Sequence, residues 1–248
     1  MKLSQKTALI TGASGGIGAV IALCFAEAGA KVLLGYGQNQ QGAIDVKAKI
    51  EAGGGQAELA GFDVTDEAPV EAAFAKFATQ NQTPGILINN AGVFSIQPLM
   101  DMRAKDWDEA MRLNLRGTFL CSREAVASGT CRVIVNIASI AANLSHEHLN
   151  HYCAAKAGVV SLTRNMAREF GPAGVRVNAV SPGLVWRETL DDEWPQGVEK
   201  WNNTAPLGRV VQPKEVAKAC LFLASDDAAA ITGIDLTIDA GISVVLPF

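Results

Sequence analysis

The strongest constraint on the fold of this chain is the regular alternation of short strand-like segments with longer helical segments. The short segments are rich in β-branched and other apolar residues, and amphipathic stretches separate them. Strands spaced by helices predict βαβ units, which build a parallel sheet covered by helices. We expect seven strands, at 7–11, 31–36, 56–62, 85–89, 132–138, 175–180 and 235–238, and helices at 17–28, 41–52, 67–79, 105–127, 152–170 and 213–224.

Seven strands in one run of 248 residues predict one domain, not two. We therefore expect a single α/β domain of the doubly wound Rossmann type over residues 1–248, with a seven-stranded parallel sheet. Ligands of such sheets bind beyond the carboxyl ends of the strands. The segment at about 183–206 is expected to form a lid over the substrate.

Composition and charge exclude several classes of protein. Hydrophobic residues make up 49% and the net charge is −4, which is atypical of a disordered chain. The sequence has no Lys/Arg run that would indicate a nucleic-acid surface. It also has no apolar stretch of about 18 residues that would predict a membrane span. Because the five cysteines are odd in number and form no CxxC pair, we expect reduced thiols. These features favour a cytoplasmic protein that binds neither nucleic acid nor membrane.

A glycine-rich turn, TGASGGIG, connects the first expected strand to the first expected helix. Gly12 allows a tight turn, Gly16 lets the backbone approach a pyrophosphate, and Gly18 allows close helix–sheet packing. The helix N-terminus offers free N–H groups to phosphates. Such a turn also occurs without a ligand, but its place in the first βαβ unit favours a dinucleotide site.

The residue at the end of the second strand bears on the choice of nucleotide. An acidic residue there would bind the ribose hydroxyls and favour NAD, but this chain has Tyr36. Basic residues that would bind a 2′-phosphate are also missing, because Gly15 and Gly37 stand at the relevant positions. Gln38 and Asn39 could still donate hydrogen bonds to a phosphate. We therefore favour NADP(H) over NAD(H).

Tyr152 and Lys156 form an i, i+4 pair, which places them on one helix face. A lysine beside a phenol lowers the tyrosine pKa and suits it to acid–base catalysis. Ser139 follows a strand at the ligand-binding edge and could bond a substrate oxygen. Asn114 is a polar residue in an otherwise apolar helical stretch, where a satisfied buried amide is the simplest interpretation.

Taken together, these motifs resemble the short-chain dehydrogenase/reductase family, and in particular its 3-oxoacyl-carrier-protein reductase-like members. The resemblance covers the whole chain and includes NNAG at 89–92, VRVNAVSPG at 175–183 and ITGIDLTIDAG near the C-terminus. It implies an enzyme that interconverts a carbonyl and an alcohol by hydride transfer with a nicotinamide cofactor. Family members are usually homotetramers or homodimers, with the helices at 105–127 and 152–170 as the expected contact faces.

The resemblance also implies a role for each matching residue. Tyr152 would be the general acid or base, Ser139 would hold the substrate oxygen, and Lys156 would bind the nicotinamide ribose and lower the tyrosine pKa. Asn114 would hold a water in a proton relay. Asp63 and Val64 would flank the adenine. The implied cofactor contacts besides Tyr152 and Lys156 are Gly12, Ser14, Gly16, Ile17, Gly18, Tyr36, Asp63, Val64, Asn90, Ala91, Gly92, Pro182, Gly183 and Val185.

The substrate pocket is less well defined by the sequence. Three of the four tryptophans, Trp186, Trp194 and Trp201, fall in the expected lid and could wall a pocket or anchor the lid. Arg187 stands where the family often has a threonine, and it could bind an anion or form a salt bridge. All three histidines precede Tyr152, but we expect no metal site. The substrate candidates are Phe94, Leu144, His146, Trp186 and Arg187.

Two other functions fit the same fold. A dinucleotide-binding sensor without turnover would be expected to lack the tyrosine or the lysine, whereas this chain has all four catalytic positions. An epimerase or dehydratase with the same cofactor would be expected to carry a further substrate domain. Both alternatives are therefore less favoured than an oxidoreductase acting on a small carbonyl or alcohol.

Overall fold

The computed structural model describes residues 2–245, so residue 1 and residues 246–248 of the expected domain lie outside the described part. Its centre is a seven-stranded sheet in the order β3-β2-β1-β4-β5-β6-β7, with every neighbouring pair parallel. The predicted Rossmann-type fold is confirmed. The strands are β1 (Thr7–Ile10), β2 (Lys31–Tyr36), β3 (Gln56–Gly61), β4 (Ile86–Asn89), β5 (Val133–Ile137), β6 (Arg176–Pro182) and β7 (Asp235–Ile238).

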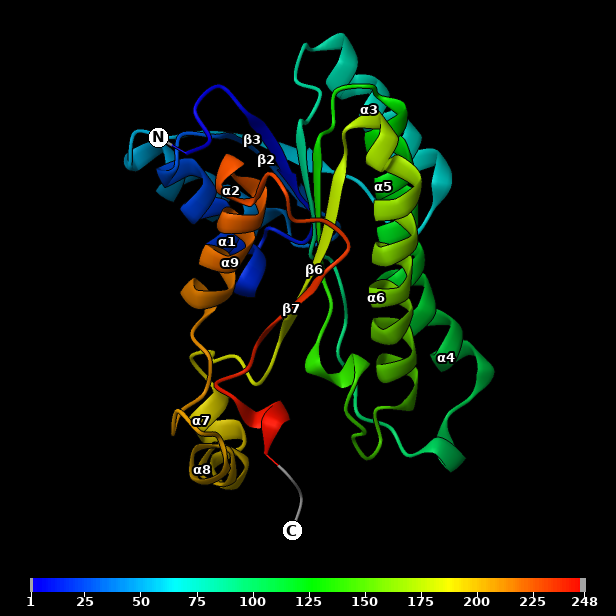
Figure 1. Ribbon diagram of the computed structural model, residues 1–248, viewed down its shortest axis with the longest axis vertical. Helices are drawn as coiled ribbons and strands as arrows, with labels where there is room; N and C mark the ends of the chain where they lie inside the picture. Colours follow the sequence, from blue (N-terminus) through cyan, green and yellow to red (C-terminus); the bar gives the residue numbers. More distant parts are fainter. Residues whose placement is uncertain (1, 246–248) are drawn as a thin grey trace.

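Helices cover both faces of the sheet (Figure 1). One layer holds α1 (Gly16–Glu27), α2 (Gln40–Ala52) and α9 (Pro213–Ala224). The opposite layer holds α3 (Glu67–Thr79), α5 (Gly117–Ala127) and α6 (Asn150–Phe170). Because both faces are covered, the central strands are buried on both sides and read as continuous apolar runs.

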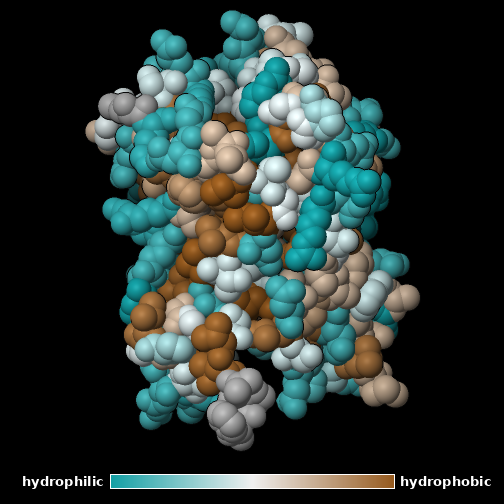
Figure 2. Space-filling view, viewed as in Figure 1, coloured by the Kyte–Doolittle hydropathy of each residue, from teal (hydrophilic) through white to brown (hydrophobic). Residues whose placement is uncertain are grey.

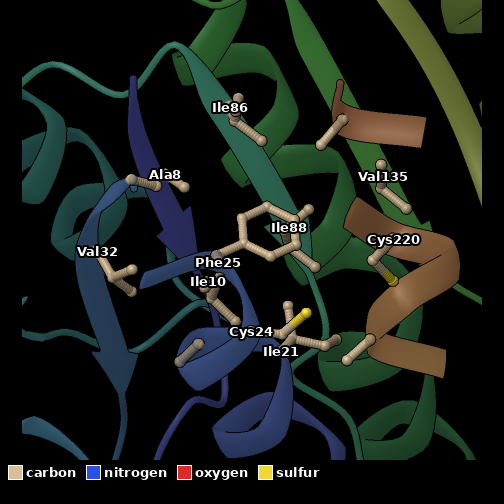
Figure 3. Close-up of a cluster of buried hydrophobic side chains, with 14 of the residues drawn as sticks. Ala8, Ile10, Ile21, Cys24, Phe25, Val32, Ile86, Ile88, Val135 and Cys220 are labelled. Atoms are coloured by element: carbon tan, nitrogen blue, oxygen red, sulfur yellow. The ribbon is translucent and has the colours of Figure 1, made fainter. Parts of the chain in front are cut away.

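The larger hydrophobic core lies between the sheet and the layer of α1 and α9. Phe25 of α1 is fully buried with Ile10 of β1 and Ile88 of β4, and Cys220 of α9 packs into the same cluster (Figure 3). Burying a side chain the size of phenylalanine contributes about 1.5–3 kcal/mol. This core fixes α1 against β1 and therefore fixes the glycine-rich turn between them.

The prediction of one continuous helix at 105–127 is wrong, because the structure interrupts this helix. The chain forms α4 (Ala104–Met111), a π-helical segment (Arg112–Arg116) and α5. The Asn114 amide lies in the π segment and donates a hydrogen bond to the Ala110 carbonyl at 3.1 Å. A π segment inside an α-helix is frequent at functional sites.

Four strands end elsewhere than their sequence patterns indicate. β1, β3 and β5 each end one residue early, at Ile10, Gly61 and Ile137. Directly after β1, the Thr11 hydroxyl accepts bonds from the backbone of Asn90 and Ala91, each at 3.0 Å. β6 continues to Pro182, because Ser181 and Pro182 pair with β7, so this end is set by a partner that is distant in sequence.

The segment expected as a lid contains two helices that the sequence did not indicate, α7 (Leu190–Glu193) and α8 (Pro195–Thr204). They lie beyond the carboxyl ends of the strands, at the bottom of Figure 1. Leu190, Val198 and Val210 are buried together and form a small hydrophobic cluster. The segment is tied back to the body where Val211 N donates to Leu184 O at 2.9 Å and Leu207 N donates to Ala240 O at 3.1 Å.

No helix within residues 2–245 combines the length and the apolar character that crossing a bilayer requires. Apolar side chains do reach the surface in one region. In Figure 2 they gather in the middle and lower part of the viewed face, between the two helix layers. This region adjoins the carboxyl ends of the strands and the α7–α8 segment.

Candidate active site

The glycine-rich turn has the backbone shape that a dinucleotide site requires. Gly12 has φ +65° and Gly16 has φ +53°, a left-handed conformation that L side chains rarely adopt. A Cβ added at Gly16 would meet no atom within 4 Å, so the backbone is open to a ligand. The turn therefore presents bare backbone at the carboxyl end of β1.

Gly18 lets α1 approach the sheet closely. A Cβ at this position would lie 2.3 Å from the Gly12 carbonyl oxygen and 2.4 Å from the Asn90 amide nitrogen. The Asn90 amide in turn donates to the carbonyls of Thr11 and Gly12, at 3.0 and 3.1 Å. Asn90 was expected to line the ribose, and it also holds the turn in shape.

The first turn of α1 is the natural place for a phosphate. The helix begins after Gly15, and no side chain caps its N-terminus. Free N–H groups and the positive end of the helix dipole are therefore available to an anion. Ile17, in this first turn, also lines the cavity described below. The residues present fit a pyrophosphate group.

The residues expected to contact the nucleoside lie at the carboxyl ends of β2 and β3. The half-buried Tyr36 packs its ring over Gly61, since a Cβ there would be 2.7 Å from the phenol oxygen. Asp63 is exposed and accepts a bond from Thr65 N at 2.9 Å, whereas Val64 is buried against Gly117. These three residues remain candidates for the nucleoside contact, as the sequence indicated.

The helix after β2 packs against the glycine-rich turn. A Cβ at Gly42 of α2 would lie 2.3 Å from the Ser14 carbonyl oxygen. Asn39 caps this helix, since its Oδ1 accepts a bond from Gly42 N at 3.0 Å. Asn39 therefore holds α2 in place, and Gln38 and Gly37 beside it are exposed.

The predicted catalytic residues meet at one cavity of about 480 Å³. Ser139 follows β5, Tyr152 and Lys156 come from α6, and Asn114 comes from the π segment, and all four line this cavity. Pro182 and Gly183 at the end of β6 and Val185 beyond it line the same space. The structure thus unites residues from four separate parts of the sequence. The other predicted residues at its wall are Ile17, Asn90, Gly92, Phe94, His146 and Arg187.

The Tyr152 pKa is shifted upward, and not downward as expected from the nearby Lys156. Burial raises the pKa of Tyr152, while a hydrogen bond with the Ser139 side chain acts to lower it. Burial also lowers the pKa of Lys156 to about 8. The Lys156 ammonium nitrogen lies 5.6 Å from the centre of the Tyr152 ring and donates to the Ile137 carbonyl at 2.9 Å. Desolvation is therefore the largest influence on the pKa of each group.

Close backbone approach at Gly92 brings Asn114 and Lys156 together. A Cβ at Gly92 would be 2.7 Å from the Asn114 amide oxygen and 3.6 Å from the Lys156 nitrogen. Any side chain at this position would therefore collide with the Asn114 amide beside Lys156. The glycine of the NNAG motif is thus explained by the site, not by a turn.

A buried hydrogen-bond network that the sequence did not reveal lies beneath the site. The Asn89 amide donates to Ser122 and to Asn136, both at 2.9 Å, and Asn136 donates to Thr163 at 2.9 Å. These contacts join β4, β5, α5 and α6. The only sequence signal was polar residues inside apolar strands, which cannot name their partners.

The lid contributes two of its three tryptophans to the cavity wall, but not the one named as a substrate candidate. Trp194 and Trp201 line the cavity, whereas Trp186 does not. The Trp186 backbone pairs with Val211 at 2.8 Å, and its side chain is partly exposed. Leu144, in the turn after β5, is also absent from the wall. The sequence could not predict these orientations because the lid helices were not foreseen.

Arg187 lines the cavity and forms an ion pair with Glu193. Hydrogen bonds from Thr189 and Arg187 lower the pKa of Glu193. Thr189 is the threonine nearest to position 187, where the family often has one. Its side chain bonds Glu193 within the lid. Arg187 thus forms a salt bridge, which was one of its two interpretations, and its binding of a substrate anion stays a prediction.

The histidines before Tyr152 have different roles. His146 lines the cavity, and the His148 carbonyl accepts a bond from Gln97 N at 2.8 Å. His151 is buried and lies 2.8 Å from the Ser95 hydroxyl. Within residues 2–245, no group of three or more His, Cys, Asp and Glu side chains could hold a metal ion. All five cysteines are free thiols.

A family model described as enoyl-(acyl carrier protein) reductase matches residues 12–243. The chain belongs to the short-chain dehydrogenase/reductase family. This short-chain dehydrogenase/reductase is accordingly an oxidoreductase acting on alcohols or ketones. The predicted family resemblance is confirmed.

Several characterised relatives are similar over nearly their whole length. D-threitol dehydrogenase from Mycolicibacterium smegmatis is 40% identical, over 98% of this chain and 95% of the relative. A 3-oxoacyl-[acyl-carrier-protein] reductase from Synechocystis is 37% identical, over 96% and 97%. A solved gluconate 5-dehydrogenase from Burkholderia cenocepacia, in complex with NADP and tartrate, has TM-score 0.91 and 31% identity, over 99% and 98%.

Proposed function

We propose that this short-chain dehydrogenase/reductase interconverts a ketone or aldehyde and an alcohol with NAD(P)(H), and that Tyr152 is the general acid or base. The observation that supports this most is the meeting of Ser139, Tyr152 and Lys156 at one cavity, at the sheet edge that also carries the glycine-rich turn. The fold by itself requires neither a glycine-rich turn that is open to a ligand nor a buried lysine.

The residues that would hold the cofactor fit its parts. The uncapped N-terminus of α1 and the open backbone at Gly16 would receive the pyrophosphate. Lys156 uses one N–H on the Ile137 carbonyl, which leaves two donors for ribose hydroxyls. Pro182, Gly183 and Val185 would lie beside the nicotinamide. When bound, this cofactor supplies hydride transfer at the carbonyl carbon.

The chain's own residues handle the substrate oxygen and its proton. In reduction, Tyr152 donates its phenolic proton to the oxygen as the alcohol forms; in oxidation, it accepts that proton. Ser139 donates a hydrogen bond to the same oxygen and stabilises the charge that develops there. Because burial raises the Tyr152 pKa, the phenol is protonated at neutral pH, which is the form needed for reduction.

Asn114 takes a positioning role in this proposal. Its amide holds the loop at Val93 through two hydrogen bonds, at 3.0 and 3.1 Å, and its oxygen lies close to Gly92 and thus to Lys156. A water held at this place would connect Lys156 to solvent and restore the proton that Tyr152 gives up.

We favour NADP(H) over NAD(H). No carboxylate stands at Tyr36 to repel a 2′-phosphate, and the exposed Gln38 beside it can donate a hydrogen bond. The gluconate 5-dehydrogenase with bound NADP supports the same choice by similarity. The D-threitol and gluconate relatives make small polyols, hydroxy acids and their keto forms the first substrates to test.

The decisive experiment compares wild-type protein with Tyr152→Phe on NADPH and NADH consumption over ketones, keto acids and keto sugars. We expect turnover by the wild type and a loss of at least about 10²-fold in kcat for the variant. The cofactor dissociation constant, measured by nicotinamide fluorescence, should stay within about threefold, because the phenyl ring preserves the packing. Normal turnover by Tyr152→Phe would contradict the role of this tyrosine.

We also propose a homotetramer or homodimer that uses the outer sides of α4, α5 and α6. Trp107 on α4 and Phe119 on α5 are 39% and 43% exposed, so both offer apolar surface that an interface would bury. Sedimentation equilibrium tests this proposal. Trp107→Glu together with Phe119→Glu should lower the measured mass to that of a smaller species.

A further inference from the structure

The residue directly before Tyr152 is a buried histidine with one hydrogen-bond partner. His151 is 1% exposed, and its Nε2 lies 2.8 Å from the Ser95 hydroxyl. The other ring nitrogen, Nδ1, is buried without a partner among the described residues. A buried polar atom without a partner opposes folding, so an apolar residue would serve better if packing were the only requirement.

Ser95 belongs to a loop, residues 93–97, that follows the NNAG motif and contacts the start of α6 in three places. The Ser95 hydroxyl bonds His151, Gln97 N donates to the His148 carbonyl at 2.8 Å, and the rings of Phe94 and Tyr152 meet edge to face. The ring centres are 5.3 Å apart with an interplanar angle of 84°. All three contacts join the loop to the segment that carries the proposed catalytic tyrosine.

Besides these contacts, the Gln97 side chain donates to the Asp101 carbonyl and to the Asp106 carboxylate, both at 3.2 Å. Phe94 is 58% exposed and Ile96 is 68% exposed, so burial contributes little to their positions. At the other end of the loop, Asn114 bonds both backbone groups of Val93. The loop is therefore fixed by polar contacts at its two ends, with Phe94 between them.

The position of Phe94 affects both the substrate pocket and the tyrosine. Its ring lines the same cavity as Ser139 and Tyr152. A shift of the ring would change the space beside the substrate carbonyl and remove the edge-to-face contact with the phenol. Ser95 directly follows Phe94, which lines the pocket, and His151 directly precedes Tyr152, the proposed proton donor. The Ser95–His151 hydrogen bond is thus one residue away from each of them.

We propose that Ser95 and His151 are positioning residues, whose hydrogen bond holds Phe94 against Tyr152 and thereby sets the affinity for the carbonyl or alcohol substrate. This inference rests on the proposed function, in which Tyr152 acts on the substrate oxygen. Neither residue touches the reacting atoms. Their effect should therefore fall on the substrate KM and not on cofactor binding.

The first test is Ser95→Ala, which removes one hydroxyl from an exposed loop residue and leaves the core intact. We expect the substrate KM to rise about 3- to 10-fold, as for the loss of one hydrogen bond, with the cofactor dissociation constant unchanged. Ser4→Ala, the same change at an exposed serine in the turn before β1, is the matched control and should leave KM unchanged. An unchanged KM in Ser95→Ala would overturn the proposal.

The second test uses the geometry of the imidazole. A glutamine at 151 can place a polar atom near the position of Nε2, whereas an asparagine reaches only the position of Nδ1. We expect His151→Gln to keep KM within about threefold of wild type and His151→Asn to match Ser95→Ala. A double variant, Ser95→Ala with His151→Asn, should be no worse than either alone. Equal KM values for the glutamine and asparagine variants, or additive effects in the double variant, would overturn the proposal.

The third test needs no turnover and separates this inference from the proposed function. With 4-fluorophenylalanine at position 94, the fluorine resonance reports the surroundings of that ring. We expect Ser95→Ala to shift or broaden the resonance and Ser4→Ala to leave it unchanged. If the resonance does not respond, the hydrogen bond does not position Phe94. If it responds while the wild type turns over no carbonyl, the positioning holds and only the proposed reaction is wrong.

Discussion

The side-chain amide of Asn114 bonds both backbone groups of Val93. Its oxygen accepts from Val93 N at 3.1 Å, and its nitrogen donates to Val93 O at 3.0 Å. The same nitrogen donates to the Ala110 carbonyl at 3.1 Å. The residue is 1% exposed, so each of these bonds is made away from water. Asn114 therefore connects the π segment to the loop that follows β4.

Asn114→Asp is expected to break this connection. A carboxylate can only accept hydrogen bonds, so one of its oxygens would face the two carbonyls that the amide now bonds. We expect the free energy of unfolding to fall by about 1–3 kcal/mol in urea denaturation at pH 7. Asn165→Asp, on the exposed side of α6, is the control and should change it by less than about 0.5 kcal/mol. Equal stabilities of the two variants would contradict the buried role of Asn114.

Gly18→Ala is expected to destabilise the protein even though alanine favours helices. The new methyl group would lie 2.3 Å from the Gly12 carbonyl oxygen, so α1 must move away from the sheet. We expect a loss of about 1–3 kcal/mol together with weaker cofactor binding. Gly171→Ala meets no atom within 4 Å and serves as the control in thermal unfolding. A Gly18→Ala protein as stable as Gly171→Ala would show that the close approach is dispensable.

Tyr36→Asp tests the preference for NADP(H). A carboxylate at the end of β2 would repel a 2′-phosphate and accept hydrogen bonds from a free ribose. We expect the ratio of kcat/KM for NADPH to that for NADH to fall by at least about tenfold. Tyr36→Phe keeps the ring over Gly61 without a charge and should leave the ratio within about threefold. A similar fall in both variants would assign the effect to packing and not to charge.

Lys156→Met is expected to stabilise the cofactor-free protein while abolishing turnover. Burial lowers the lysine pKa from 10.5 to about 8, so between these values the unfolded chain binds more protons than the folded one. The stability of the wild type therefore rises with pH through this window, and the cost of the buried charge is greatest below pH 8. We expect the variant to gain about 1–3 kcal/mol at pH 7 and less at pH 10.

Urea denaturation of wild type and Lys156→Met at pH 7, 8.5 and 10 measures this difference. Other groups titrate in both proteins and cancel in the comparison. The difference should shrink as pH rises. A gap that is constant with pH would show that the lysine is not destabilised by its burial.

The sequence predicted most of the fold because its signals are local. The strand patterns of β1 to β5 and the helical patterns between them each predict their own element. All six expected helices appear, one of them interrupted. The end of β6 was missed because Ser181 and Pro182 are held by β7, more than 50 residues later. The π segment was missed because helical periodicity does not predict the hydrogen bonds between Asn114 and Val93.

The candidate site was also predicted in part. Ser139, Tyr152 and Lys156 were identified by spacing and resemblance, and the structure brings them to one cavity. The pocket wall was predicted less well, since Trp194 and Trp201 line it and Trp186 does not. Ring orientation depends on how α7 and α8 pack, which no local sequence pattern determines. The balance of pKa effects at Tyr152 also depends on burial, which no motif records.

The lid contains its own small hydrophobic cluster, with Leu190, Val198 and Val210 buried together and Trp201 packed against them. Its interior is thus separate from the two large clusters that stabilise the sheet. Residues on its inner side can change without disturbing the parts that fold the domain and hold the proton donor. The lid is therefore the part of this chain that evolution, or an engineer, can rewrite to obtain a new substrate while the remaining architecture stays as it is.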